Sequence, residues 1–366
     1  MKRGAAIACV VAAALLPHNA SAQAVALAPS GRIAVAHDSV IELFAADAKT
    51  RIWSAEGLPY VSTLAVGATK LAVVDAVEGR VVVADLADGH GFRIQVEGTP
   101  IDALFVGDDL YLLQRDASAL ERISSDGTRT SAPTGRYPQF LRRSGRRLLV
   151  YAADGTLDEF TADPVARAHS VAAPPFATDL ETDGRFAYLV DPDDRKLLVF
   201  SLDPPARAGE RTLGGFPIDL AVLSGPEAAA PGQGPYDSFA YKAPVGQGAG
   251  TEPKYDVPPA VLVVADPASA SIVQFEVGRP APEIGSLVPV QSLAFGGPRR
   301  VRLPTAVDRV VSAGRKWVGY DSASRVLYSL VDGKAAPIAH DVGPHAFQAR
   351  AGTIAFWNGA LVARKL

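Results

Sequence analysis

Leu71-Ala-Val-Val-Asp75 and Arg80-Val-Val-Val-Ala-Asp85 are two short apolar runs separated by four residues. β-Branched residues dominate both runs, and a turn residue, Asp, ends each of them, which is typical of paired antiparallel strands. The same arrangement recurs twice further along the chain, at Phe186-Ala-Tyr-Leu-Val-Asp191 with Lys196-Leu-Leu-Val-Phe200, and at Val261-Leu-Val-Val-Ala-Asp266 with Ser271-Ile-Val-Gln-Phe275. The pattern predicts a repeated β-hairpin.

The turn residue of this hairpin marks a repeat along the whole chain, and most of its intervals are close to 40 residues. The eight turn residues are Asp38, Asp75, Asp116, Asp154, Asp191, Asp266, Asp321 and Asn358. A Gly precedes each central strand, and in seven units a Pro lies shortly before that Gly, with an apolar strand between them. Each unit therefore reads as Pro, strand, Gly turn, strand, Asp turn, strand, and a weaker fourth strand.

Four antiparallel strands in about 40 residues are typical of one blade of a β-propeller, because such a small sheet must bury both faces against its neighbours. The fold class is therefore all-β, with eight four-stranded blades favoured and seven as the alternative. The last unit holds only three strands, so we expect a strand from about Ala24 to Ala28 to complete it and close the ring. A Gly- and Pro-rich insertion at about 226–259 interrupts the sixth unit.

The Pro, Gly and Asp spacing of these units resembles that of the YVTN/NHL-type β-propeller superfamily over nearly the whole chain after residue 22. The resemblance concerns architecture and implies the propeller fold. It implies no particular activity, because one fold carries many functions.

The N-terminal segment has the parts of a secretory signal peptide. Lys2 and Arg3 precede an apolar run from Ala5 to Leu16, and Ala20-Ser-Ala22 forms a small-residue cleavage site. We expect cleavage after Ala22, a single propeller domain over 23–366, and a periplasmic or extracellular location. The alternative is lipidation at Cys9, which follows Ala6-Ile-Ala8.

Overall composition excludes several classes of protein. The chain has 366 residues, of which 48% are hydrophobic and 20% charged, and its formal net charge is −3. These values exclude a largely disordered or collagen-like chain and leave no electrostatic reason to expect a nucleic-acid partner. No later stretch of about 20 apolar residues appears, so we expect no membrane span.

Polar residues near the start of the inner strands are the candidate site, because these strand ends converge at one mouth of a propeller channel. They are Asp102, Asp179, Asp219, Asp308 and His345. Converging carboxylates repel one another unless a cation lies among them, and oxygen ligands suit Ca²⁺ or Mg²⁺, so the four Asp residues are candidate metal ligands. The alternative is that these Asp side chains cap turns. His37, beside the turn residue Asp38, is a further candidate.

The leading functional hypothesis is an exported β-propeller that binds or scaffolds an unidentified protein or small molecule at its channel mouth. The alternative is a divalent-metal-dependent hydrolase or lactonase, since gluconolactonase-like propellers, which these units also resemble, hold a metal with channel carboxylates. A third possibility is an accessory protein of a periplasmic quinoprotein redox system. Two basic clusters, Arg142, Arg143, Arg146 and Arg147, and Arg299, Arg300 and Arg302, are read as solvated turns or as contacts for an anionic partner.

Overall fold

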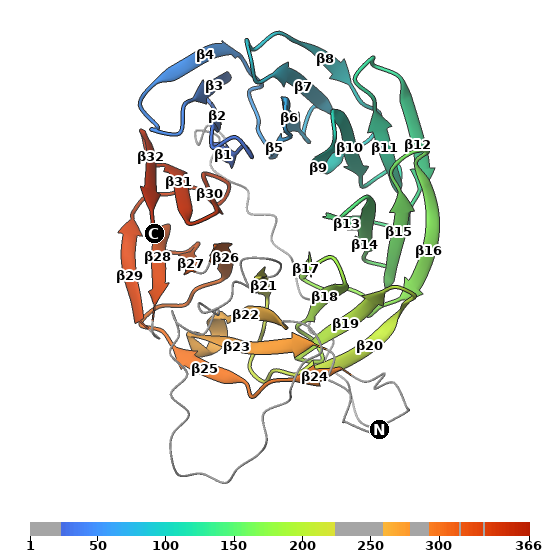
Figure 1. Cartoon of the computed structure of the whole chain (residues 1–366), viewed down its shortest axis with the longest axis vertical. Helices are drawn as coiled ribbons and strands as arrows, with labels where there is room; N and C mark the ends of the chain where they lie inside the picture. The colour runs from blue at the N-terminus through green and yellow to red at the C-terminus, as the bar shows by residue number, and fades with distance from the viewer. Residues whose placement is uncertain (1–22, 224–258, 279–292, 315, 332–333) are drawn as a thin grey trace, which may run out of the picture.

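The computed structural model describes residues 23–223, 259–278, 293–314, 316–331 and 334–366. Eight antiparallel sheets follow one another in chain order around a central axis, which confirms the β-propeller and the favoured count of eight blades (Figure 1). The sheets hold four strands each, except that the sixth has two separate outer segments and the eighth has three strands.

The first four blades have strands of four to seven residues. Blade 1 contains β1 (Ala24–Leu27), β2 (Ile33–His37), β3 (Val40–Phe44) and β4 (Arg51–Glu56). Blade 2 contains β5 (Thr63–Val66), β6 (Lys70–Asp75), β7 (Arg80–Asp85) and β8 (Gly91–Gln95). Blade 3 contains β9 (Pro100–Val106), β10 (Asp109–Gln114), β11 (Ala119–Ile123) and β12 (Arg129–Pro133). Blade 4 contains β13 (Pro138–Ser144), β14 (Arg147–Ala152), β15 (Thr156–Thr161) and β16 (Ala166–Ala172).

The last four blades depart more from the repeat. Blade 5 contains β17 (Asp179–Thr182), β18 (Phe186–Asp191), β19 (Lys196–Leu202) and β20 (Pro205–Thr212). Blade 6 contains β21 (Asp219–Leu223), β22 (Ala260–Asp266), a short 3-10 turn η1 (Pro267–Ser269), β23 (Ser271–Gly278), β24 (Ala294–Phe295) and β25 (Arg299–Arg302). Blade 7 contains β26 (Arg309–Ala313), β27 (Lys316–Asp321), β28 (Val326–Val331) and β29 (Lys334–Ala339). Blade 8 contains β30 (Phe347–Arg350), β31 (Thr353–Trp357) and β32 (Leu361–Lys365).

The turn Asp residues stabilise the hairpins that the sequence predicted. In blade 2, the Asp75 Oδ1 atom accepts the backbone N–H groups of Val77 and Glu78 at 2.9 and 3.0 Å. Asp191 and Asp321 accept backbone N–H groups in the same way in blades 5 and 7. A carboxylate that bonds the backbone two and three residues ahead closes a turn, so the structural role expected for these three residues is confirmed.

Eight hydrophobic clusters hold the ring together, one between each pair of consecutive blades. Alternate residues of one strand face opposite neighbours, so each blade contributes to two clusters. In β6, for example, Leu71 and Val73 pack toward blade 1, whereas Ala72 and Val74 pack toward blade 3. This two-sided burial explains why the central strands are nearly continuous apolar runs rather than alternating ones.

Blades 1 and 8 close the ring by packing, and the expectation that an N-terminal strand completes blade 8 is wrong. β1 pairs with β2 and is the innermost strand of blade 1. It is linked to the last blade by a backbone hydrogen bond from Val25 N to His345 O at 3.1 Å and by hydrogen bonds of Leu27 with the side chains of Gln348 and Arg350. A hydrophobic cluster that includes Val35 and Ala355 packs the two blades together. Pairing β1 with β2 closes a loop of five residues, between Leu27 and Ile33, and costs less loop entropy than pairing it with a strand more than 300 residues away.

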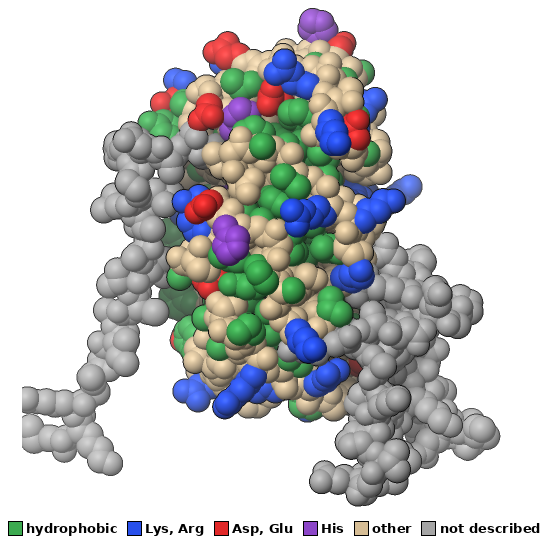
Figure 2. All heavy atoms as spheres, turned by 90° about the vertical axis from the view of Figure 1, so that its left-hand side faces the viewer, with side chains coloured by type: hydrophobic (Ala, Val, Ile, Leu, Met, Phe, Trp, Pro, Cys, Tyr) green, Lys and Arg blue, Asp and Glu red, His purple; other side chains and the backbone are tan. Residues whose placement is uncertain are grey.

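The outer edge of blade 8 is therefore left unpaired. Among the described residues β32 pairs with β31 alone. The segment 347–366 contains Arg350, Arg364 and Lys365 and no acidic residue. Figure 2 views the ring from the side of β4, β32 and β29, and shows Lys and Arg side chains spread over its middle and lower parts. A positive edge of this kind disfavours pairing with a second copy of the same edge.

Several sequence predictions fall on residues outside those described. The signal segment 1–22, including Cys9, is one, and most of the insertion at about 226–259 is the other. The flanking strands β21 and β22 are hydrogen-bonded neighbours, so this insertion joins the first two strands of blade 6. No helix among the described residues is long and apolar enough to cross a membrane.

Candidate functional site

Three of the candidate Asp residues occupy equivalent positions on inner strands. Asp102, Asp179 and Asp219 pair with Leu113, Val190 and Ala265, each near the Asp-turn end of the neighbouring strand. Each carboxylate accepts a backbone N–H from the inner strand of the next blade: Asp102 from Leu141 at 3.1 Å, Asp179 from Leu220 at 2.9 Å, and Asp219 from Val310 at 2.6 Å. The three side chains thus tie blades 3 to 4, 5 to 6 and 6 to 7.

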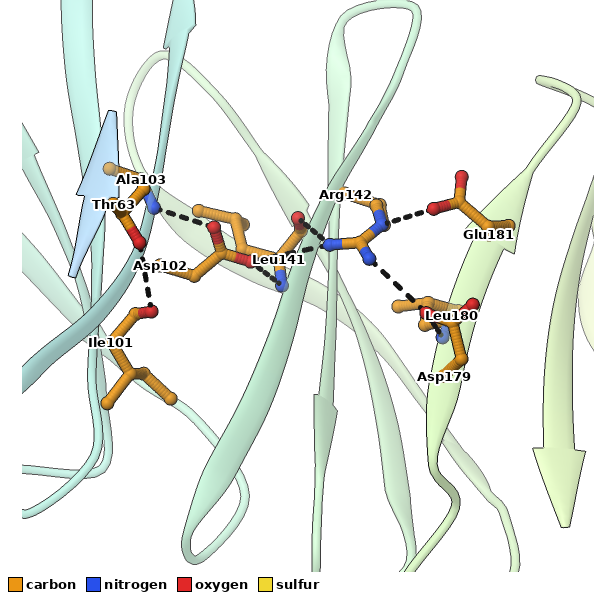
Figure 3. Close-up of polar contacts among 9 residues, drawn as sticks. All are labelled: Thr63, Ile101, Asp102, Ala103, Leu141, Arg142, Asp179, Leu180 and Glu181. Carbon is orange, nitrogen blue, oxygen red and sulfur yellow. Dashed lines mark hydrogen bonds and ion pairs between the residues drawn. The ribbon is translucent and has the colours of Figure 1, made fainter. Parts of the chain in front are cut away.

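Arg142 joins two of these carboxylates to a third acid (Figure 3). Its Nε atom lies 3.0 Å from Glu181 Oε1, and its two terminal nitrogens lie 3.4 Å from Asp102 Oδ2 and Asp179 Oδ1. The guanidinium also donates to the backbone oxygen of Leu141 at 3.1 Å. One cation on β13 is therefore shared by three acids from blades 3 and 5. Glu181 and Arg142 were not among the site residues that the sequence suggested.

This inner-rim cluster, defined as Asp102, Arg142, Asp179, Glu181 and Asp219, is surrounded by protein but still reached by solvent. The exposed fraction of the side chain is 24% for Asp102, 7% for Asp179, 28% for Arg142 and 32% for Glu181. Charged groups in such a position lose much of their hydration, which disfavours the ionised form of a carboxyl group.

Desolvation accordingly dominates the titration of the acids in the inner-rim cluster. It raises the pKa of Glu181 to about 7, an effect that the nearby Asp179 reinforces and Arg142 opposes. Desolvation also raises the pKa of Asp102 and Asp179, against the attraction of Arg142. The pKa of Asp219 lies well above its ordinary value, because burial and the negative charge of Asp179 both disfavour ionisation.

Arg309 and His345 lie next to the inner-rim cluster, on the side of blades 7 and 8. Arg309 donates to Pro344 O at 2.6 Å, and its guanidinium lies 4.9 Å from the ring centroid of Phe347. It lies close enough to Asp179 and Asp219 to favour their ionised forms. Desolvation and the positive charge of Arg309 lower the pKa of His345, which favours the neutral imidazole.

Asp308 is not brought to the other three Asp residues. Arg309, and not Asp308, pairs with Tyr320 just before the Asp turn of blade 7, at the position that Asp219 holds in blade 6. Neighbouring residues of a strand point to opposite faces, so this difference of one residue turns Asp308 away. Its carboxylate instead accepts the backbone N–H of Ser322 at 3.2 Å.

A divalent metal among these Asp residues stays a prediction. Within the described ranges, no group of three or more His, Cys, Asp or Glu side chains is arranged to hold a metal ion. The oxygens of Asp102 and Asp179 are directed to backbone N–H groups, and Arg142 supplies a positive charge between them. These contacts are of the kind expected from the alternative reading, in which the Asp side chains serve the backbone.

His37 lies at the seam between blades 1 and 8. Its two ring nitrogens lie 3.1 Å from Asp38 Oδ2 and 3.0 Å from Glu42 Oε2, and its ring stacks on Trp357 with centroids 4.3 Å apart. Although burial raises the pKa of Glu42, the hydrogen bonds from His37 and Arg51 lower it overall. His37 therefore contacts both blades where the ring closes, apart from the inner-rim cluster.

The two basic clusters of the sequence are divided among different neighbours. Arg142 joins the inner-rim cluster, whereas Arg143 donates to the backbone oxygens of Gly145 and Phe105. Arg300 contacts the turn residue Asp266 at 2.5 Å and thereby ties β25 to the hairpin of blade 6. Arg146 and Arg147 remain on the opposite face of the ring, at the turn between β13 and β14.

Comparison with known proteins supports the fold and no specific function. No protein-family model and no curated protein matches the sequence. Similar solved structures include BamB from Moraxella catarrhalis, with a TM-score of 0.59, 10% identity, and 95% of each chain covered. The dihydro-heme d1 dehydrogenase NirN has a TM-score of 0.58 and 12% identity, covering 87% of this chain and 67% of its own. A streptogramin B lyase has a TM-score of 0.54 and 9% identity, covering 83% and 92%.

At these identities the likeness concerns architecture alone. It supports the β-propeller fold that the described sheets form.

Proposed function

We propose that this protein is an exported β-propeller that binds, rather than transforms, a ligand or partner side chain carrying a positive charge at the inner rim. The observation that carries the proposal is the charge of the inner-rim cluster. Four acids, Asp102, Asp179, Glu181 and Asp219, share Arg142 and the neighbouring Arg309 as their positive charges. The Glu181 side chain is 32% exposed, which supports its contact with a ligand group from solvent.

A bound cation would offset the cost that desolvation imposes on these acids. Burial, reinforced by the negative charge of Asp179, raises the pKa of Glu181 and Asp219 despite the nearby arginines. A positive group within about 4–6 Å favours the ionised form and lowers such a pKa. Binding of an amine or guanidinium should therefore release protons at neutral pH, and Glu181, with a pKa of about 7, should contribute to that release.

The N-terminal segment supports the export part of the proposal. Lys2 and Arg3, the apolar run to Leu16 and the small residues before Gln23 are the elements that a signal peptidase substrate needs. Expression in a bacterial host, followed by N-terminal sequencing of the exported protein, tests this directly. A mature chain that begins at Gln23 supports export, and a chain that keeps residues 1–22 contradicts it.

A metal-dependent hydrolase is the second candidate, and one observation favours it. Glu181 has a pKa of about 7, which is the range in which a carboxyl group works as a general acid or base near neutral pH. Ca²⁺ or Mg²⁺ with oxygen ligands from the inner-rim cluster would be the partner of such a group. Hydrolysis of lactones or esters that depends on added Ca²⁺ and is lost in Glu181→Gln would favour this candidate over binding.

Titration calorimetry of the purified protein with spermidine, CaCl₂ and MgCl₂ tests the leading proposal. We expect Glu181→Gln to weaken spermidine binding about tenfold, since a hydrogen bond between charged groups contributes about 1.5–3 kcal/mol. Asp308→Asn is the matched control, because it removes one carboxylate that bonds Ser322 outside the inner-rim cluster. Equal effects of the two variants, or binding of none of the three cations, would overturn the proposal.

A further inference from the structure

A cavity lies between blades 4 and 5, on the face of the ring opposite the inner-rim cluster. Its volume is about 590 Å³, and residues 144–147, 184–186 and 201–203 line it. The first two segments join the first and second strands of their blades, and the third joins β19 to β20. The inner-rim acids lie instead near the Asp turns, so the two sites are distinct. The volume is within the range of small-molecule pockets, about 300–1,000 Å³.

Three arginines from two blades line this cavity. Arg147 is held in place by a hydrogen bond to Leu202 O at 2.5 Å and an ion pair with Glu159 at 3.3 Å. Arg185 is held by Asp183 at 3.2 Å. An arginine that is already oriented loses little conformational freedom when a ligand arrives, and its planar group suits the oxygens of a phosphate.

Arg146 differs from the other two arginines. It is exposed, and no hydrogen bond or ion pair joins its side chain to another described residue. Its charge therefore has no ion-pair partner among the described residues, whereas Arg147 pairs with Glu159 and Arg185 with Asp183. The arginine-lined part of the cavity thus combines Arg146 with two guanidinium groups that Glu159 and Asp183 hold in place, which favours binding of an anionic group at the arginines.

Asp203 adds a negatively charged carboxylate to the lining of the same cavity. Its backbone N–H donates to Ser201 Oγ at 3.3 Å, and its exposed carboxylate has no partner among the described side chains. A carboxylate repels a simple anion but accepts hydrogen bonds from hydroxyl groups. A ligand that matches both the arginines and Asp203 must carry an anionic group and, a short distance away, hydroxyl groups.

We infer that this cavity binds a phosphorylated sugar. The phosphate lies against Arg146, Arg147 and Arg185, and the sugar hydroxyls donate to Asp203. This assignment gives a role to the basic turn of blade 4 and to Arg185 of blade 5, which line the same cavity and which hydrophobic packing of the blades does not require. It is independent of the function proposed for the inner rim, because it uses none of the same residues.

Titration calorimetry with inorganic phosphate, glucose 6-phosphate and glucose tests the inference. Arg146→Gln should weaken binding of both phosphorylated ligands about tenfold, as expected for the loss of a charge-assisted hydrogen bond. Arg143→Gln is the matched control: it removes the same charge from the same turn, but Arg143 contacts Gly145 and Phe105 instead of lining the cavity. Arg143→Gln should change binding less than twofold, about 0.4 kcal/mol.

Asp203→Asn separates a sugar phosphate from a simple anion. It should weaken glucose 6-phosphate while leaving inorganic phosphate unchanged or tighter, because it removes repulsion along with a hydroxyl acceptor. Glucose itself should bind far more weakly than glucose 6-phosphate. Three results would overturn the inference: equal effects of Arg146→Gln and Arg143→Gln, equal effects of Asp203→Asn on both phosphorylated ligands, or no binding of either one by the native protein.

Discussion

Replacing Glu181 by Gln should make the protein more stable at pH 8 and leave its stability almost unchanged at pH 4.5. Glu181 is ionised at pH 8 beside Asp179, in a position that desolvates it. Gln keeps a side-chain oxygen that can accept the hydrogen bond from Arg142, but it carries no charge. If the ion pair between Glu181 and Arg142 stabilised the protein instead, the same substitution would lower the free energy of unfolding.

The pKa of Glu181 sets both the size and the pH window of the effect. A carboxyl group whose pKa is raised on folding binds its proton more tightly in the native state. The free energy of unfolding therefore falls as the pH rises from the pKa of the group in the unfolded chain to its pKa in the folded protein. Here that window runs from 4.5 to about 7. The full difference corresponds to about 3 kcal/mol, and because solvent reaches about a third of this side chain we expect about 1–2 kcal/mol.

Urea denaturation followed by tryptophan fluorescence at half-unit steps from pH 4 to pH 8.5 measures this directly. The native protein should lose stability across the window more steeply than the variant, and the two curves should diverge as the pH rises. Glu159→Gln is a suitable comparison, because Glu159 also pairs with an arginine, Arg147, but lies outside the inner-rim cluster. A Glu181→Gln variant that is less stable than the native protein at pH 8 would refute the reasoning.

Three further predictions concern the rest of the ring. Arg142→Met should lower the free energy of unfolding by about 3 kcal/mol at pH 7 in urea denaturation, and by less at pH 5, because three acids lose their shared cation and protonate more readily at the lower pH; an equal loss at both pH values would contradict this. Trp357→Ala should lower the melting temperature by several degrees in calorimetry, since it removes the ring stacked on His37 where blades 1 and 8 meet; an unchanged melting temperature would show that the seam does not depend on it. Backbone amides of Leu361, Ala363 and Lys365 should exchange hydrogen faster than those of Val362 and Arg364. Leu366 N donates to Gly352 O, so the N–H groups of every second residue before it, Arg364 and Val362, also point to β31, and those of the other three point outward. Slow exchange of the three outward amides would mean that another segment covers this edge.

The inner rim shows how a difference of one residue separates sequence reading from structure. Counting from the Pro and Gly markers placed Asp308 with Asp102, Asp179 and Asp219. The pairing of Arg309 with Tyr320 shows that Arg309 holds that position in blade 7. Positions counted from the Pro and Gly residues can be wrong by one residue without changing the predicted strands. The same error changes which side chains share a face, because adjacent side chains of a strand point to opposite faces.

Arg142 shows the same limit for charge. In the sequence it belongs to a basic turn with Arg143, Arg146 and Arg147, and nothing local distinguishes it from them. Its partners Asp102 and Glu181 lie about one repeat away on either side, in the two neighbouring blades. Only the closed ring brings the three inner strands side by side.

The local sequence was sufficient to predict the strands, the hairpin turns and the eight repeats. Apolar β-branched runs, Asp turns and Gly turns act within a few residues, and a sheet too small to bury both faces must stack on copies of itself. The identity of the charged neighbours depended instead on contacts between blades. Those contacts join residues 37 to 91 positions apart, and their register is set by the packing of the ring and not by any short stretch of the chain.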